Sequence, residues 1–181
     1  MVTREARTLS RDVEVAAIPY GDRITLTMGT TVFITQALGG SYTAMTDHGY
    51  LVRIEGKDAD AIGEKPTLPM TAEDVAGRGT QELAWEQLKT CFDPEIPVNI
   101  VDLGLVYSCD VHTDEHGDRV IDVKMTLTAP GCGMGDVLVQ DVRDKVEIIP
   151  TVKRADVELV FDPPWSQSMM SEAARLQTGM M

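Results

Sequence analysis

The sequence predicts an α+β protein in two domains, a small β meander or barrel followed by a three-stranded mixed sheet with helices. Before residue 63, short strand-like segments are separated by glycine turns. After residue 71, helical and strand patterns alternate in the order α-β-β-α-β-α, which is typical of a sheet covered by helices. We place the boundary in the proline-bearing stretch 63–70, which gives domains at 1–70 and 71–181.

The first domain contains recognisable strands joined by tight turns. Gly39-Gly40 is a strong two-residue hairpin signal, and the next turn holds His48, which is expected to be solvated. Four or five short strands favour a meander or a partly closed barrel. The sequence offers no nucleophile with its base and no phosphate loop here, so this domain alone does not indicate a function. Strands are expected at Ile24–Met28, Thr31–Leu38, Ser41–Thr46 and Tyr50–Ile54.

Helical patterns open the second domain. Thr71-Ala-Glu-Asp74 has the form of a capping box for a short helix, and Gln81 to Cys91 is expected to form the next helix. Cys91 would lie in its last turn, where the helix dipole disfavours a thiolate. A packing role is therefore predicted for Cys91.

An acidic loop leads into the sheet. Pro94 and Pro97 exclude both a helix and a central strand, so the loop should be extended and fixed. It carries Asp93, Glu95 and Asp102. Asp93 either caps a turn or serves a site, and Asp102 either satisfies loop amides or serves a site, because rigid loops commonly hold functional residues.

A single cysteine marks the joint between a strand and a helix. Val120 to Leu127 alternates as in a half-buried strand, and Pro130 with Gly131 ends it. Apolar residues then recur at helical spacing from Met134 to Val146. Cys132 therefore precedes a first helical turn, where backbone N–H groups and the helix dipole favour a thiolate. The alternative is a buried cysteine that acts as a small apolar residue.

Strand directions bring separate loops to one end of this sheet. The strands Leu105–Val111 and Val120–Leu127 should form a hairpin, and the helical crossover makes a third strand parallel to the second. The loops with Asp102, Cys132 and Trp165 then emerge together, so these residues are predicted neighbours. Trp165, with two methionines nearby, is either a core plug or an exposed anchor for a partner.

The hairpin tip contains a His-x-x-x-His pair, His112 and His116. This spacing places two imidazoles on one face only in a helix, whereas Gly117 closes a turn here. A solvated loop is predicted instead of a metal site.

A last strand, Asp156–Phe161, ends at a pair of prolines. A final helix follows, for which Ser166 or Ser168 is the expected N-cap and Glu172 suits the early part.

Composition narrows the range of partners. Of 181 residues, 43% are hydrophobic and 25% are charged, as in ordinary globular proteins. No run approaches the roughly 18 apolar residues of a membrane span, and no signal peptide is recognisable, so a cytoplasmic location is expected. The net charge of −13 argues against nucleic acid or a membrane and favours a basic protein surface. Three irregularly spaced cysteines suggest reduced thiols.

Three segments resemble the signatures of a known domain. Asp93–Tyr107, Met125–Cys132 and Val157–Trp165 are similar, in this order, to those of the iron–sulfur cluster assembly-associated domain. In the first half, Gly29–Thr43 and Asp58–Gly63 resemble the N-terminal extension of bacterial SufT-type proteins. The chain as a whole therefore resembles the SufT-type family, most densely in the second domain.

The resemblance implies a non-enzymatic auxiliary factor in iron–sulfur cluster assembly or transfer to clients. Cys132 falls on the motif cysteine and is expected to contact metal, cluster or client, with Asp102 tuning it and Trp165 docking the partner. The implied partners are iron–sulfur scaffold or carrier proteins and client apoproteins. Further supporting candidates are Asp93, Glu95 and Thr128.

Ligand number limits what Cys132 can hold. A cluster generally needs four ligands, usually thiolates. Either two chains contribute one Cys132 each, as in a homodimer, or the site binds a cluster or iron only in passing, so no tightly bound cofactor is expected. The resemblance also leaves open an accessory subunit of a multicomponent oxygenase. A thiol enzyme is a third reading, although no histidine belongs to the predicted cluster.

Overall fold

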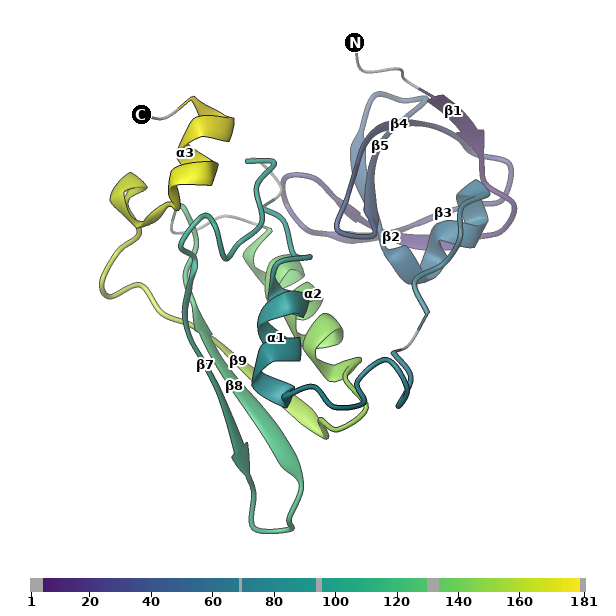
Figure 1. Cartoon of the computed structure of the whole chain (residues 1–181). Coiled ribbons are helices and arrows are strands. Elements are labelled where there is room, and N and C mark those ends of the chain that lie inside the picture. Colours follow the sequence, from purple (N-terminus) through teal and green to yellow (C-terminus); the bar gives the residue numbers. More distant parts are fainter. Residues whose placement is uncertain (1–4, 69, 94–95, 130–133, 180–181) are drawn as a thin grey trace. The chain divides into compact units, whose positions relative to one another are not determined.

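The computed structural model, shown in Figure 1, describes residues 5–68, 70–93, 96–129 and 134–179. The chain divides into two compact units, the first unit (residues 1–68) and the second unit (residues 69–181). The first has a six-stranded sheet, and the second has a three-stranded sheet with helices. The α+β class predicted from the sequence is confirmed. Within the described ranges, no helix is both long and apolar enough to span a bilayer.

The sheet of the first unit is antiparallel and has the strand order β1-β4-β5-β6-β2-β3. β4 to β6 form a meander, whereas β1 lies beside β4 and the β2–β3 hairpin lies beside β6. The expected number of four or five strands is wrong, because neither β1 nor β2 was among the strands predicted. β1 has no apolar alternation and joins the sheet through its backbone. The strands are β1 (Glu5–Thr8), β2 (Val13–Ala17), β3 (Arg23–Leu26), β4 (Thr31–Leu38), β5 (Ser41–Thr46) and β6 (Leu51–Ile54).

The predicted hairpin turn at Gly39-Gly40 is confirmed. Both glycines have positive φ angles, 60° and 80°, which a two-residue turn requires, and Leu38 pairs with Ser41 across it. The strands enclose a small core in which Val15, Val52 and Ile54 are completely buried.

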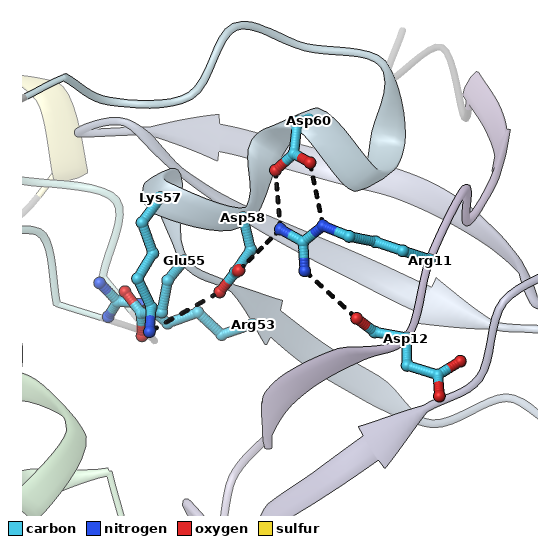
Figure 2. A network of polar contacts seen from close by, with 7 residues as sticks. All are labelled: Arg11, Asp12, Arg53, Glu55, Lys57, Asp58 and Asp60. Atoms are coloured by element: carbon cyan, nitrogen blue, oxygen red, sulfur yellow. Dashed lines mark hydrogen bonds and ion pairs between the residues drawn. The ribbon is translucent and has the colours of Figure 1, made fainter.

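A polar clamp joins the 3₁₀ helix η1 (Gly56–Ile62) to the β1–β2 connection (Figure 2). The Arg11 guanidinium donates to both oxygens of Asp60, at 2.7 and 2.9 Å, and to Asp58 Oδ1 at 2.9 Å. It also donates to the Asp12 carbonyl at 3.2 Å. The hydrogen bond from Arg11 holds the pKa of Asp60 below its usual range. Asp58 and Asp60 therefore have a structural role, because they bind the β1–β2 connection to η1.

The sheet of the second unit has the order β7-β8-β9. β7 and β8 form an antiparallel hairpin, and β9 is parallel to β8, as the sequence predicted. Its strands are β7 (Val106–Thr113), β8 (Arg119–Met125) and β9 (Arg154–Leu159).

Helices α1 and α2 contact each other, and they pack against β7 and β9 respectively. In Figure 1 both helices lie over the same face of this sheet. Ile121, Val123 and Met125 alternate along β8 toward them, and Leu88 and Leu138 complete the core from the helices. The helices are α1 (Thr80–Leu88), α2 (Gly135–Glu147), the 3₁₀ turn η2 (Gln167–Met169) and α3 (Glu172–Thr178).

The sequence motif at Thr71–Asp74 forms its hydrogen bonds but no helix. Thr71 N and Oγ1 both donate to Asp74 Oδ2 at 2.7 Å, and Asp74 N donates to Thr71 Oγ1 at 3.3 Å. The chain continues in turns until α1, so the expected short helix is wrong. A reciprocal cap satisfies a turn as well as it satisfies a helix start.

The final helix starts later than predicted. Ser171, and neither Ser166 nor Ser168, is the N-cap of α3, because its hydroxyl accepts from Ala174 N at 3.1 Å. The hydroxyls of Ser166 and Ser168 bond each other at 2.7 Å instead. Glu172 lies in the first turn, as expected.

Candidate functional site

Loops from three strands meet at one end of the second unit's sheet. The chain enters β7 there and leaves β8 and β9 there. Thr126 N donates to the Leu105 carbonyl, and Val160 N donates to the Met125 carbonyl, each at 2.8 Å. We call the loops 92–105, 126–129 and 160–170 the sheet-end loops. The hairpin tip with His112 and His116 lies at the other end of the strands.

The segment Asn99–Gly104 contains a cluster of side-chain hydrogen bonds. Asn99 Oδ1 accepts from Val101 N at 3.1 Å and from Asp102 N at 2.9 Å. Asn99 Nδ2 donates to Asp102 Oδ2 at 2.6 Å. The half-buried Asp102 thus shares its turn with an amide that the sequence analysis did not single out. The only signal for it was the Asn-x-x-Asp spacing.

The C-terminal segment fixes this turn from the other side. Trp165 Nε1 donates to the Leu103 carbonyl at 2.7 Å, and Ser171 N donates to the Asp102 carbonyl at 2.8 Å. Gly104 has a φ of 77°, and a Cβ there would lie 2.3 Å from the Met169 carbonyl oxygen. Hydrogen bonds therefore join the segment that contains Trp165 to the turn that contains Asp102.

The two methionines near Trp165 differ in burial. The indole is half-buried and packs against the core, and Met170 is 3% exposed. Met170 therefore belongs to the core of the second unit, whereas Met169 is half-buried. Tyr107 Oη contacts Met169 Sδ at 3.7 Å and donates to the Pro163 carbonyl at 2.6 Å.

Asp93 caps a turn, which is the first of its two alternatives. Its Oδ1 accepts from Ile96 N at 2.9 Å, and the residue is 8% exposed. Its backbone N–H donates to the Val98 carbonyl at 3.3 Å. Glu95 lies outside the described residues.

The two described cysteines belong to the core. Cys91 is completely buried just beyond the end of α1, which confirms its packing role. Cys109 is 2% exposed, and burial, with the charge of Asp110 as a smaller cause, raises its pKa to about 11. Cys132 lies outside the described residues, as do its immediate neighbours.

The flanks of Cys132 are described on both sides. Thr128 is half-buried in a bend after β8. The hydroxyl of Thr126 is buried and has no hydrogen-bond partner in the part of the chain that the structure describes. Gly135 opens α2, and a Cβ there would lie 2.9 Å from Leu127 Cδ1. This glycine therefore has a packing reason beyond leaving space for a ligand. Among the described residues, no side chain caps the first turn of α2.

No group of three or more His, Cys, Asp or Glu that could hold a metal ion occurs in the described part of the chain.

Comparison with known proteins places this unit in a family. Residues 82–159 match the family model of the iron–sulfur cluster assembly protein. A Porphyromonas gingivalis protein named Fe-S protein maturation auxiliary factor is 46% identical over 102 residues, 56% of this chain and 93% of that protein. The chain belongs to this iron–sulfur cluster assembly family.

Two further proteins are similar to the chain. The Fe-S protein maturation auxiliary factor SufT of Staphylococcus aureus is 41% identical over 87 residues, 48% of this chain and 94% of that protein. A crystal structure of a domain of unknown function from Bacillus anthracis is 37% identical, with a TM-score of 0.48. The match covers 56% of this chain and 93% of the Bacillus anthracis chain.

Proposed function

We propose that the protein is an auxiliary factor that passes iron–sulfur cargo, a cluster or iron, to client apoproteins through Cys132. The observation that carries this proposal is the 46% identity to a protein named Fe-S protein maturation auxiliary factor, which is matched over 93% of that protein's length. The described site adds a carboxylate, Asp102, on a rigid turn at the same sheet end from which the strand before Cys132 emerges.

The supply of thiols favours transfer over storage. Clusters are usually held by four thiolates. Cys91 and Cys109 are buried in the core, and the raised pKa of Cys109 disfavours the thiolate that binds metal. One cysteine per chain then remains for the cargo. Two chains contribute one Cys132 each while cargo is bound, or the cargo is held only during its passage to the client.

The protein acts in this proposal without catalytic turnover. A cysteine nucleophile needs a base close by. The two histidines of the second unit lie at the hairpin tip, at the far end of the strands from the sheet-end loops. The partners are an iron–sulfur scaffold or carrier and client apoproteins, and the net charge of −13 suits a basic partner surface.

Anaerobic purification of the full chain with iron and sulfide analysis and Mössbauer spectroscopy tests this proposal. We expect less than one cluster per chain, transferable to an added apoprotein, and loss of the iron in Cys132→Ala. Cys109→Ala is the matched control and should keep its iron. Equal iron in Cys132→Ala and the wild type would refute the role of this thiol.

A further inference from the structure

The first unit has an apolar groove beside its edge strand β3. In the β2–β3 pair, Ile24 lies opposite Val15 and Leu26 lies opposite Val13. Residues that face each other across two strands point to the same face of the sheet, and both valines belong to the core. Val15 is completely buried, whereas Ile24 is 39% exposed. The core of the first unit is therefore uncovered along β3.

Two hydrogen-bonded turns complete this groove, which has a volume of about 200 Å³. Besides Ile24, it is lined by Thr30, Thr46 and Tyr50. Thr46 Oγ1 accepts from Tyr50 N at 3.1 Å, which fixes the turn between β5 and β6. Leu9 N donates to the Thr30 carbonyl at 2.9 Å, which fixes the end of the β3–β4 connection. The walls of the groove are thus held by bonds within the first unit itself.

The backbone of β3 has one free edge beside this groove. β3 is the last strand of its sheet and, among the described strands, pairs with β2 alone. In an antiparallel pair, every second residue directs its N–H and C=O away from the neighbouring strand. Domains that bind an extended peptide at a sheet edge use both features, because the backbone gives affinity and a side-chain pocket gives specificity.

Size and charge indicate what this groove accepts. A volume of about 200 Å³ is below the roughly 300–1,000 Å³ of small-molecule sites and suits a single aliphatic side chain. Asp47 lines the groove, and its one ion-pair contact among the described residues is His48 at 3.7 Å. Asp22 directly precedes β3 and is exposed. Arg23 alternates with Ile24 along the strand and so lies on the opposite face. The rim of the groove is therefore acidic.

We propose that the groove binds an extended basic segment of a partner protein, which adds a strand to β3. An aliphatic side chain of this segment fills the space between Ile24 and Tyr50. A lysine or arginine two residues away points to the same side and faces Asp47. The inference goes beyond the proposed function, because neither Cys132 nor iron enters it. It gives the first unit a role in partner recognition.

The competing explanations are a solvated edge and pairing with β3 of a second copy of the chain. Edge strands are often kept short so that nothing pairs with them, and β3 has four residues. A second copy would bring another acidic rim, with a second Asp47, against the first. Charge complementarity therefore favours a basic partner.

The experiment titrates the isotope-labelled full chain with two synthetic peptides and follows its amide resonances by NMR. The first is acetyl-Lys-Thr-Ile-Thr-Lys-amide, in which both lysines share a face with the isoleucine, and the second has glutamate in place of each lysine. We expect the lysine peptide to shift the resonances of β3 and of Thr46–Tyr50. The glutamate peptide should bind at least about tenfold more weakly, because like charges then face each other.

Two pairs of variants locate the binding site. Tyr50→Ala should bind the lysine peptide about tenfold more weakly. Tyr20→Ala is the matched control and should bind normally, since Tyr20 is 73% exposed, against 67% for Tyr50, and does not line the groove. Asp47→Asn should weaken binding of the lysine peptide about threefold. Its control is Glu14→Gln, which removes an exposed acid opposite Thr25 on the outer face of the same hairpin.

Three results would overturn the inference. The absence of shifts with the lysine peptide would mean that the edge is only solvated. Equal affinity for the two peptides, or an equal loss in Tyr20→Ala, would mean that the peptide adheres without using the groove. A molar mass that doubles with concentration in the wild type but not in Tyr50→Ala would assign the edge to a second copy. If Tyr50→Ala does not fold, the Asp47→Asn and Glu14→Gln pair decides, and an equal effect of these two contradicts the proposal.

Discussion

In the first unit the carboxylates of Asp58 and Asp60 face the guanidinium of Arg11, whereas in the second unit the carboxylate of Asp102 faces a neutral amide. Both sets of acids lie in segments that resemble the same family. The Arg11 clamp occupies both oxygens of Asp60 and joins η1 to the β1–β2 connection. Asn99 occupies one oxygen of Asp102 and leaves its charge without a described cation.

The difference separates acids that are paired with an arginine from an acid whose side-chain hydrogen bond comes from a neutral amide. A charge paired with an arginine has its partner already, so a motif residue of this kind needs no further function. Asp102 is bonded by an amide instead, and no described cation lies against it. The two described cysteines likewise have a structural role, because Cys91 and Cys109 are buried in the core of the second unit.

The largest loss of stability should come from truncating a core side chain in either unit, because each unit has its own hydrophobic core. Leu138→Ala in the second unit and Ile54→Ala in the first each remove a buried side chain and should cost about 2–5 kcal/mol. Hydrogen exchange during urea unfolding should show the loss only in the unit that carries the variant. Equal loss of hydrogen-exchange protection in both units would show that the two cores do not stabilise their units separately.

The next effect contrasts two glycines with positive φ. Gly29→Ala in the first unit has no atom within 4 Å of the new Cβ, so it should cost only the left-handed backbone penalty, about 1–2 kcal/mol. Gly104→Ala adds a collision with the Met169 carbonyl and should cost more. Urea midpoints of the two variants measure this. An equal cost would show that the C-terminal segment does not press against the Asp102 turn.

A smaller effect is expected at Trp165. Trp165→Phe keeps an aromatic ring but removes the donor to the Leu103 carbonyl, at a cost of about 1 kcal/mol. Trp85→Phe is the control, since Trp85 is also half-buried and its indole makes no hydrogen bond among the described residues. Thermal unfolding checks the pair. If Trp165→Phe is as stable as the wild type but binds an apoprotein client poorly, Trp165 is a partner anchor instead.

The smallest effect concerns pH. Arg11 lowers the pKa of Asp60 in the folded state, so its contribution is present above the unfolded pKa, about 3.9, and is lost as pH falls through the folded value. Asp60→Asn should lower the urea midpoint of the first unit at pH 7, and the difference from wild type should shrink below pH about 4. Asp22→Asn, an exposed acid on the same unit, should show neither change.

Sequence patterns predicted the strand pairing of the second unit, because its alternation and helical crossover leave one right-handed solution. They did not reveal β1, since Glu-Ala-Arg-Thr has no apolar rhythm and pairs through its backbone. They placed the cap of α3 too early, because three serines follow the proline pair and only tertiary contacts select Ser171. Asn99 was missed for a related reason. Its role depends on a hydrogen bond to a neighbour's side chain, which composition and periodicity do not report.

The central claim is that Cys132 contacts iron–sulfur cargo or client, and Cys132→Ser tests it most directly. The variant should be expressed at the wild-type level in a strain that lacks the native protein. The activity of an iron–sulfur enzyme and the urea midpoint of the purified variant should then be measured together. We predict a wild-type midpoint and enzyme activity no higher than in the strain without the protein. Full enzyme activity with normally expressed Cys132→Ser would contradict the claim.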